Sequence, residues 1–213
     1  MRCPVCRGDD VRAFATVAAR DYRRCGACAA TFLEPAQRPD AASEQAHYRT
    51  HRNDAADPGY RRFAARLAQP LAARLAPGAR VLDFGCGPSS ALAALLAEAG
   101  HAVVAYDPVF APDAAALQGV YDAVAAAEVV EHLHDPAATF ARLATRVRPG
   151  GWLACMTCFQ TDDARFAGWW YRRDPTHVVF YRAETFHHLA ARLGWTCEIP
   201  AKDVALLQRP AGP

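Results

Sequence analysis

Long apolar runs are missing from this 213-residue sequence. No stretch of about 18 consecutive apolar residues occurs, so we expect no membrane-spanning helix. The N-terminal stretch MRCPVCRGDD also lacks the apolar region of a secretory signal. We therefore expect a cytoplasmic protein that does not contact a membrane.

Neither sign of charge predominates in the sequence. The formal net charge is +2, the pI is near 8.2, and Lys202 is the only lysine among 24 basic residues. An excess this small does not by itself indicate a nucleic-acid partner, because such partners usually meet a strongly basic surface. The charge therefore leaves the class of partner open.

Apolar residues are plentiful enough for a core, at 52% of the sequence. The length suits one domain of about 150 residues with a small appendage. Composition divides the chain into three regions. We expect a zinc ribbon at residues 1–33, a linker with a lid helix around Tyr48 and Arg52 at residues 34–58, and a larger domain at residues 59–213.

Eight cysteines occur, and in a reducing compartment they indicate metal binding, catalysis or packing rather than disulfides. Four of them form two CxxC pairs separated by 18 residues. Two such pairs complete the tetrahedron of thiolates that Zn²⁺ prefers, and a segment this short needs a metal to fold. We predict that the structural zinc ligands are Cys3, Cys6, Cys25 and Cys28.

The other four cysteines are expected to be packing residues. Cys155 and Cys158 form a third CxxC, but residues three apart on a strand point to opposite faces. Cys86 lies in a glycine turn and Cys197 in a late strand, where a small buried side chain is the simplest role.

From residue 59 onward, predicted strands and helices alternate. We expect strands at RVLDF, HAVVAYD, YDAVAAAE and WLACMT, a turn at RPGG, helices at residues 59–76 and 88–99, from Pro136 onward and at 183–193, and an antiparallel pair at 195–200 and 203–208. Alternation predicts an α/β fold with a mostly parallel sheet covered on both faces. Because ligands bind at the carboxyl ends of such strands, the loops after Phe84, Tyr106 and Ala127 should form the site.

A glycine turn follows the first of these strands, in VLDFGCGPSS. Gly85 and Gly87 allow a tight turn and a close approach of the backbone to a ligand. Asp107 ends the next strand, at a spacing typical of a carboxylate that binds ribose hydroxyls. The third glycine of a dinucleotide-binding turn is absent.

Asp83 indicates the charge of the ligand. Unit charges about 4 Å apart interact by roughly 4 kcal/mol at an effective dielectric of about 20. Asp83 would therefore repel a pyrophosphate and attract an ammonium or a sulfonium. S-adenosylmethionine carries both cations and a ribose. The alternative is that Asp83 only hydrogen-bonds its own loop.

The segments VLDFGCGPS, VVAYDP and YDAVAAAEVVEHLHDPAATFARLATRVRPGGWL together resemble class I S-adenosylmethionine-dependent methyltransferases over about residues 61–208. The resemblance implies a Rossmann-like, seven-stranded sheet with one antiparallel strand. It also implies the cofactor contacts: Asp83 on the amino group, Asp107 on the ribose, Pro108 and Val109 beside the adenine, and Gly85, Gly87, Ala127 and Glu128 beside the methionine part.

One segment departs from that family. Only 13 residues separate Asp107 from Tyr121, which is too short for the helix and edge strand that the family usually has there. We expect the edge strand to be missing or vestigial. The residue that contacts the adenine amino group is then undefined, and Asp113 is a weak candidate.

Methyl transfer requires the protein to position the acceptor and exclude water and, for some acceptors, to remove a proton. His132 and His134 follow a strand in EVVEHLHDP, and His132 is the better placed. Glu131 beside them could equally pair with an arginine. We predict His132 as one of two catalytic residues.

The second catalytic candidate is His177, in WWYRRDPTHVVFYRAETF at residues 169–186. This segment would gather aromatic side chains around His177, in a pocket suited to an apolar or planar acceptor. A loop that caps the core would explain the same composition. The aromatic residues are Trp169, Trp170, Tyr171, Phe180 and Tyr181.

The favoured function is methylation of a small-molecule acceptor, with S-adenosyl-L-methionine and structural zinc as cofactors. The main alternative is an RNA methyltransferase that docks through the ribbon, since residues 1–30 hold six arginines and three aspartates; a carrier protein is a further partner to consider. Asp83 and the missing third glycine disfavour a nicotinamide-dependent oxidoreductase. The intact glycine turn and Asp107 disfavour a non-catalytic protein.

Overall fold

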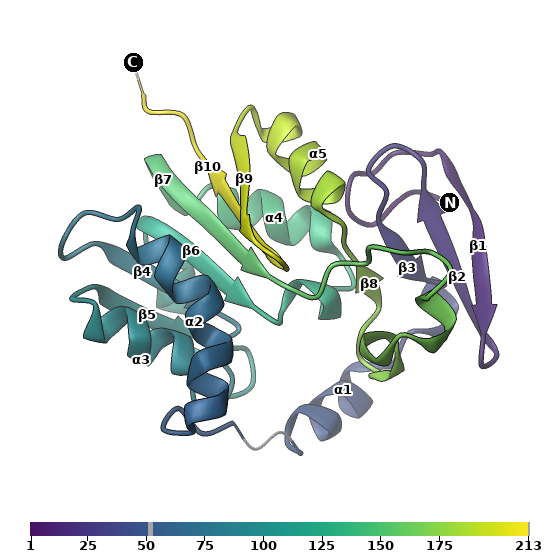
Figure 1. Cartoon of the computed structure of the whole chain (residues 1–213), viewed down its shortest axis with the longest axis horizontal. Coiled ribbons are helices and arrows are strands. Elements are labelled where there is room, and N and C mark those ends of the chain that lie inside the picture. Colours follow the sequence, from purple (N-terminus) through teal and green to yellow (C-terminus); the bar gives the residue numbers. More distant parts are fainter. Residues whose placement is uncertain (51–52, 213) are drawn as a thin grey trace.

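The computed structural model describes residues 1–50 and 53–212. Its larger part is built on a six-stranded sheet with the order β5-β4-β6-β7-β10-β9 (Figure 1). The strands are β4 (Arg80–Phe84), β5 (Ala102–Tyr106), β6 (Tyr121–Ala127), β7 (Val147–Met156), β9 (Thr196–Ala201) and β10 (Val204–Gln208).

The first four strands of this order run parallel, and β10 pairs antiparallel with both β7 and β9. The predicted α/β class and the closing antiparallel pair are confirmed. The missing edge strand is confirmed as well. Between β5 and β6 the chain forms the short 3-10 helix η2 (Ala114–Gln118), which leaves β5 at the edge of the sheet.

Helices cover both faces of this sheet (Figure 1). Apolar stripes explain their placement, such as Leu67 and Leu71 on one helix and Phe140 and Leu143 on another, all buried. Two core clusters result, one on each face of the sheet. One face carries α2 (Pro58–Ala72) and α3 (Ala91–Glu98), and the other carries α4 (Pro136–Ala144) and α5 (Ala183–Leu193).

The N-terminal segment forms a second, four-stranded sheet of β1 (Val11–Val17), β2 (Arg20–Cys25), β3 (Thr31–Leu33) and β8 (Val179–Phe180). β8 comes from the distant part of the chain and pairs antiparallel with β3. The Leu33 N–H donates to the Val178 carbonyl at 2.9 Å, and the Val178 N–H donates to the Glu131 carbonyl at 2.9 Å. Backbone bonds thus connect the small sheet to the loop after β6.

After β3 the chain forms η1 (Pro35–Gln37) and then α1 (Ala41–Tyr48). Helix α1 lies in the region predicted to form a lid. Asp40 caps α1 by accepting from the Ser43 N–H at 2.8 Å. Arg52, also predicted for the lid, lies outside the described residues. Among the described residues, no helix is long and apolar enough to cross a membrane.

Two predicted boundaries differ from the structure. Ser90 caps α3 by accepting from the Ala93 N–H at 3.0 Å, so the helix begins at Ala91, and Pro88 lies in the turn before it. The RPGG segment belongs to β7 rather than to a preceding turn. Gly150 there has φ of +78°, and the register with β6 shifts between Tyr121 and Ala123.

Candidate functional site

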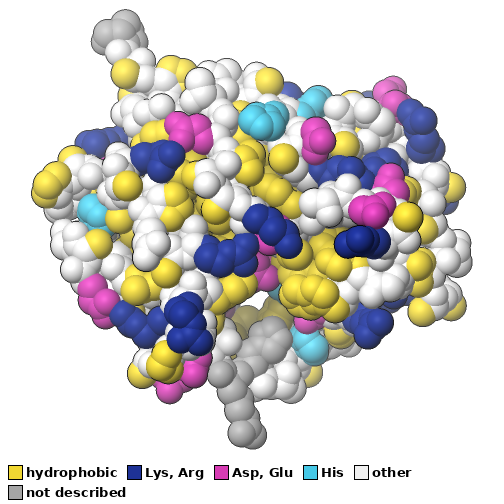
Figure 2. All heavy atoms as spheres, in the orientation of Figure 1, with side chains coloured by type: hydrophobic (Ala, Val, Ile, Leu, Met, Phe, Trp, Pro, Cys, Tyr) yellow, Lys and Arg dark blue, Asp and Glu magenta, His cyan; other side chains and the backbone are white. Residues whose placement is uncertain are grey.

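A cavity of about 610 Å³ lies at the carboxyl ends of β4, β5 and β6. This volume falls within the usual range for small-molecule sites. On the face drawn in Figure 2, the surface is hollowed beside a group of hydrophobic side chains, with Lys and Arg side chains near the rim. The cavity wall includes the predicted site residues Asp83, Gly85, Gly87, Asp107, Pro108, Ala127, Glu128, His132 and His177.

The glycine turn follows β4 and bends sharply into the cavity wall. Gly85 and Gly87 have φ of +78° and +64°, a left-handed conformation that side chains rarely adopt. A Cβ added at Gly85 would lie 2.5 Å from Val129 Cγ2. The turn is fixed by the Gly85 and Cys86 N–H groups, which donate to the Tyr106 carbonyl at 2.7 and 3.1 Å. Glycine is therefore required at position 85 by both conformation and space.

Asp83 is buried at the end of β4, with 2% of its surface exposed. The Ser90 hydroxyl donates to Asp83 Oδ2 at 2.5 Å. Among the described residues, no basic side chain forms an ion pair with Asp83. Burial raises the pKa of Asp83 to about 6, against the lowering effect of the Ser90 bond. The carboxylate is thus costly to ionise until a cation approaches it.

Asp107 holds the adjoining loop through three backbone N–H groups. Its Oδ2 accepts from Gly87 at 3.1 Å, and its Oδ1 accepts from Val109 and Phe110 at 2.8 and 3.0 Å. Pro108 and Phe110 line the cavity, whereas Val109, predicted beside the adenine, is absent from the wall. Asp113 is also outside it and instead caps η2. Phe110 therefore supplies the apolar surface expected of Val109.

Glu128 follows β6 in a left-handed conformation, with φ of +53°. Residues other than glycine rarely adopt it, and such positions often occur at functional sites. Burial, followed by the negative charge of Glu131, raises the pKa of Glu128 to about 9. Glu128 is therefore a carboxyl group in the cavity wall that is costly to ionise.

Glu131, in η3 (Val130–His132), is fully buried. The Tyr171 hydroxyl donates to Glu131 Oε1 and lies 2.9 Å from the Thr157 hydroxyl. Burial raises the pKa of Glu131 to about 7. An arginine partner for Glu131 is not found in the described residues, and its Oε1 accepts from Tyr171 instead.

His132 and His177 lie together in the cavity wall, with ring centroids 4.7 Å apart. His132 Nδ1 is 3.1 Å from the Thr176 carbonyl oxygen, and His177 Nδ1 is 2.7 Å from the Tyr171 carbonyl oxygen. Because a carbonyl oxygen only accepts hydrogen bonds, each Nδ1 carries a proton. His134 lies outside the wall and pairs with Glu44 at 2.9 Å.

The predicted aromatic pocket around His177 is only partly formed. The ring of Tyr171, in η5 (Trp170–Arg173), lies 4.1 Å from that of His177, and Trp170 is 67% exposed beside the cavity. Phe180 and Tyr181 are fully buried away from it. They lie there because β8 joins the N-terminal sheet, where Phe180 packs on Tyr22 and on Phe166 of η4 (Phe166–Gly168).

Two helices supply lining residues that the sequence patterns did not predict. Glu44 of α1, Asn53 after it, and Tyr60 and Phe63 of α2 all line the cavity, and Tyr48 of the predicted lid packs its ring 5.3 Å from that of His132. Phe63 continues the apolar stripe of α2, and nothing in the stripe distinguishes a lining position from a core one.

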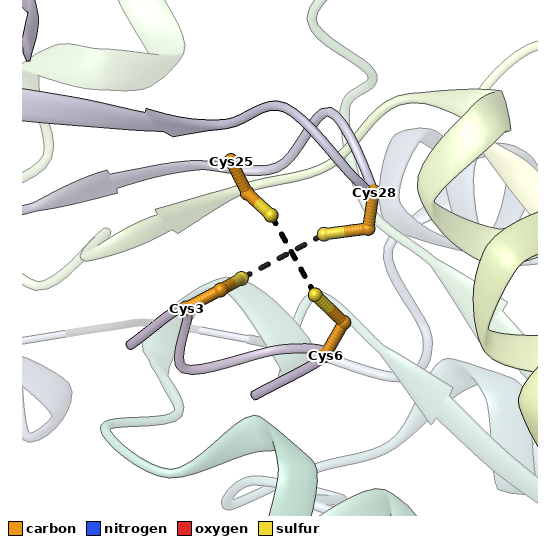
Figure 3. A group of neighbouring side chains, drawn as sticks. All are labelled: Cys3, Cys6, Cys25 and Cys28. Atoms are coloured by element: carbon orange, nitrogen blue, oxygen red, sulfur yellow. Dashed lines mark hydrogen bonds between the residues drawn. The ribbon is translucent and has the colours of Figure 1, made fainter. Parts of the chain in front are cut away.

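The four N-terminal cysteines converge from two turns (Figure 3). The Cys3 and Cys28 sulfurs are 3.7 Å apart, and the Cys6 and Cys25 sulfurs are 3.5 Å apart. Four sulfurs at about 2.3 Å from one Zn²⁺ would lie about 3.8 Å from one another. All four are buried. The cluster therefore has the spacing of a closed tetrahedral metal site.

Each cysteine pair lies in the same kind of turn. Arg7 and Ala29, each following a CxxC, have positive φ of 61° and 60°. The Arg7 N–H donates to the Cys3 carbonyl at 2.9 Å, and the Ala29 N–H donates to the Cys25 carbonyl at 3.0 Å. Two matching turns thus aim four thiols at one point.

The remaining cysteines divide between core and edge. Cys155 and Cys86 are buried, as expected of packing residues. Cys158 and Cys197 are only half-buried, because Cys158 lies beyond the end of β7 and Cys197 on the edge strand β9.

Three comparisons connect this architecture to known proteins. Residues 24–198, most of the chain, match the family model described as a methyltransferase domain. The chain is 35% identical over 121 residues to a ubiquinone biosynthesis O-methyltransferase of Xanthomonas campestris, covering 44% of this chain and 49% of that protein. The chain thus spans about half the length of the curated relatives it matches.

Solved structures share the fold at low identity. A Burkholderia thailandensis 1,6-didemethyltoxoflavin-N1-methyltransferase with bound S-adenosylhomocysteine has a TM-score of 0.57 at 19% identity, covering 94% of this chain and all of that one. A magnesium protoporphyrin IX methyltransferase from Synechocystis has a TM-score of 0.52 at 16% identity, covering 79% and 94%. This chain belongs to the family of class I methyltransferase domains, because most of it matches the family model. Its sheet order and the glycine turn after β4 agree with that assignment.

Proposed function

We propose that this chain is an S-adenosylmethionine-dependent methyltransferase that acts on a small-molecule acceptor and carries a structural zinc ion in its N-terminal ribbon. The observation that carries the proposal is the buried Asp83 beside the glycine turn and Asp107. A buried carboxylate with no basic partner among the described residues favours a cationic ligand, since a cation offsets the cost of its ionisation.

Different residues of the cavity would bind different parts of the cofactor. Asp83 would bind the ammonium of the methionine part, and the backbone at Gly85 and Gly87 would pass close to it. Asp107, already oriented by three N–H groups, would accept from the ribose hydroxyls. The cofactor supplies an activated methyl group on a sulfonium, so the protein mainly positions the acceptor and excludes water.

The ribbon residues fit zinc in a structural role. Cys3, Cys6, Cys25 and Cys28 would fill all four coordination positions, which leaves none for a substrate. The domain division follows the same logic, with residues 1–33 as the ribbon, 34–58 as linker and lid, and 59–213 as the methyltransferase domain.

The opposite part of the cavity would hold the acceptor. His132 and His177 are the residues that would assist its loss of a proton, and α1 covers this part through Glu44 and Tyr48. A covered cavity suits a small acceptor better than a nucleotide in a folded RNA. The matched ubiquinone-biosynthesis relatives support the same choice.

Calorimetry with S-adenosylhomocysteine and with NAD tests the cofactor directly. We expect S-adenosylhomocysteine to bind and NAD not to bind; NAD binding without S-adenosylhomocysteine binding would overturn the proposal. Asp107→Ala should weaken S-adenosylhomocysteine by about 10- to 100-fold, because charge-assisted bonds to the ribose are lost. Asp113→Ala is the matched control, since this exposed acid on the same loop lies outside the cavity wall.

The glycine turn offers a second pair of variants. Gly85→Ala combines positive φ with a Cβ 2.5 Å from Val129, so S-adenosylhomocysteine binding should be lost. Gly100→Ala has φ of +87° but nothing within 4 Å of its Cβ. It therefore reports backbone strain alone and should retain the binding affinity of the unmodified protein.

A further inference from the structure

Glu131, His132 and His177 form a second cluster of metal-ligating groups, apart from the cysteines. One donor atom from each of the three lies within 4.8 Å of the others. Ligands around one ion at about 2.1 Å lie roughly 3 to 3.5 Å apart, so side-chain movements on the order of 1 Å would bring the three donors together. Two imidazoles and one carboxylate match a recurring donor set of open metal sites.

Each of these donors already has the supporting bond that metal ligands usually have. His132 Nδ1 faces the Thr176 carbonyl at 3.1 Å and His177 Nδ1 faces the Tyr171 carbonyl at 2.7 Å, so Nε2 is the candidate ligand atom of each ring. Tyr171 contributes twice, because its hydroxyl also donates to Glu131 Oε1. Supporting bonds of this kind fix the tautomer and the orientation of metal-bound side chains.

The second carboxylate oxygen adds an independent observation. Glu131 is fully buried, and its Oε2 has no hydrogen-bond partner among the described residues. Such an atom is costly to bury unless a ligand completes its bonding. The His132 Nε2 lies 4.0 Å from Glu131 Oε1, so the carboxylate and the imidazole nitrogen are near neighbours.

A further carboxylate lies just outside the three donors. Asp174 Oδ2 is 4.0 Å from His177 Nε2 and 3.2 Å from His47 Nε2 of α1. Its negative charge would favour a cation at the cluster and would tie the lid helix to it. His132, His177 and Asp174 all line the cavity, so coordination positions on the cavity side would remain open to a ligand.

We propose that Glu131, His132 and His177 bind a divalent transition-metal ion whose open coordination positions take an oxygen of the methyl acceptor. Nitrogen donors favour ions such as Zn²⁺, Fe²⁺ or Co²⁺ over Mg²⁺ and Ca²⁺, which prefer oxygen. A metal-bound hydroxyl loses its proton more readily, so the two histidines assist the acceptor through the ion. The role toward the acceptor rests on the proposed function; metal binding itself does not.

The test uses the full-length protein with its ribbon loaded with zinc, dialysed against metal-free buffer and titrated with Co²⁺. We expect one Co²⁺ per chain in addition to one ribbon zinc. His132→Asn and His177→Asn each keep an amide N–H to replace the Nδ1 donor and remove Nε2, and should weaken Co²⁺ binding by at least about 100-fold. His134→Asn is the control and should bind Co²⁺ like the unmodified protein.

A chain that binds no metal beyond the ribbon ion overturns the inference, as does a His132→Asn/His177→Asn double variant that binds Co²⁺ unchanged. S-adenosylhomocysteine affinity, measured on the same samples, separates this outcome from failure of the proposed function. Cofactor binding without the second metal rejects the metal site alone. Metal binding without cofactor binding rejects the methyltransferase function alone.

Discussion

The chain has two candidate metal sites, and they differ in how many coordination positions the protein itself would fill. One is formed by the four cysteines of the ribbon, and the other by Glu131, His132 and His177 at the cavity. The cysteines are all buried, point at one another and would fill every position around an ion. The cavity cluster supplies three donors, and two of them, His132 and His177, line a cavity of about 610 Å³. A closed set of ligands can only stabilise structure, whereas an open set leaves room for a substrate.

The same contrast extends to the buried acids. Among the described residues, Asp83 in the cavity wall has no basic partner, and Glu131 Oε2, buried behind that wall, has no hydrogen-bond partner. Incomplete bonding of buried groups is costly for stability, and it therefore marks where ligands are expected.

The largest effect should come from breaking the closed cluster. Cys25→Ser should abolish zinc binding and destabilise the protein by several kcal/mol, since structural zinc contributes about 10 to 16 kcal/mol to folding of small metal domains. Zinc content per chain and the midpoint of thermal unfolding measure this. Cys197→Ser, at a half-buried cysteine outside the cluster, is the control. Unchanged zinc content in Cys25→Ser would contradict the ribbon assignment.

The next effect concerns whether the two regions unfold together. Phe180 of β8 is fully buried and packs its ring on Tyr22, Phe166 and Trp169. Phe180→Ala should lower the free energy of unfolding by about 3 to 5 kcal/mol, in a single transition, because one core cluster spans both regions. Calorimetry checks this against Val120→Ala, at an exposed position. Two separate transitions would show that the ribbon unfolds independently.

A smaller effect is expected from pH at Asp83. Burial raises its pKa to about 6, so between about pH 4 and pH 6 the folded chain holds a proton that the unfolded chain loses, and stability falls as the pH rises through this window. The cofactor ammonium requires the ionised form. S-adenosylhomocysteine affinity should therefore fall by up to about tenfold per pH unit below pH 6.

Calorimetry from about pH 5 to about pH 8 measures this dependence, with Asp83→Asn as the comparison. The variant should bind more weakly and lose the pH dependence attributable to Asp83. An equal pH dependence in the variant would assign the titration to another group.

The smallest effect is expected at Ser90, which both caps α3 and donates to Asp83. Ser90→Ala should cost about 1 kcal/mol of stability. It should also move the pH at which S-adenosylhomocysteine affinity declines upward, since the Ser90 bond lowers the pKa of Asp83. Thr145→Ala, which removes a hydroxyl that donates to the Arg142 carbonyl at an exposed helix end, is the control. A pH profile unchanged by Ser90→Ala would argue against that bond.

Local patterns were sufficient to predict much of the fold. Alternating apolar strands and helical stripes gave the α/β class, Gly194 marked the end of α5, and the short segment after Asp107 gave the missing edge strand. Residue type and spacing within one strand–turn–helix unit were enough to place the glycine turn, Asp83 and Asp107 at one site, and all line the cavity. Their roles toward a cofactor stay predictions. Residue type and spacing also placed the four cysteines together.

Contacts between distant segments could not be predicted in this way. Tyr171 bonds to Glu131 across 40 residues, and no periodicity relates the two positions. Phe180 and Tyr181 have the composition of an aromatic pocket, but their direction depends on the pairing of β8 with β3. Val109 and Phe110 are adjacent, and only the turn around Asp107 decides which of them lines the cavity.

The strand β8 also has a consequence for synthesis. The ribosome produces β3 about 150 residues before the strand that pairs with it. During that interval the nascent N-terminal sheet has an unpaired edge, which is the kind of edge that other chains can pair with. Early metal capture by the cysteines would keep this edge in an ordered hairpin until β8 emerges. With the proposed zinc site, the supply of zinc during translation would therefore affect how much of the chain reaches its native fold rather than aggregating.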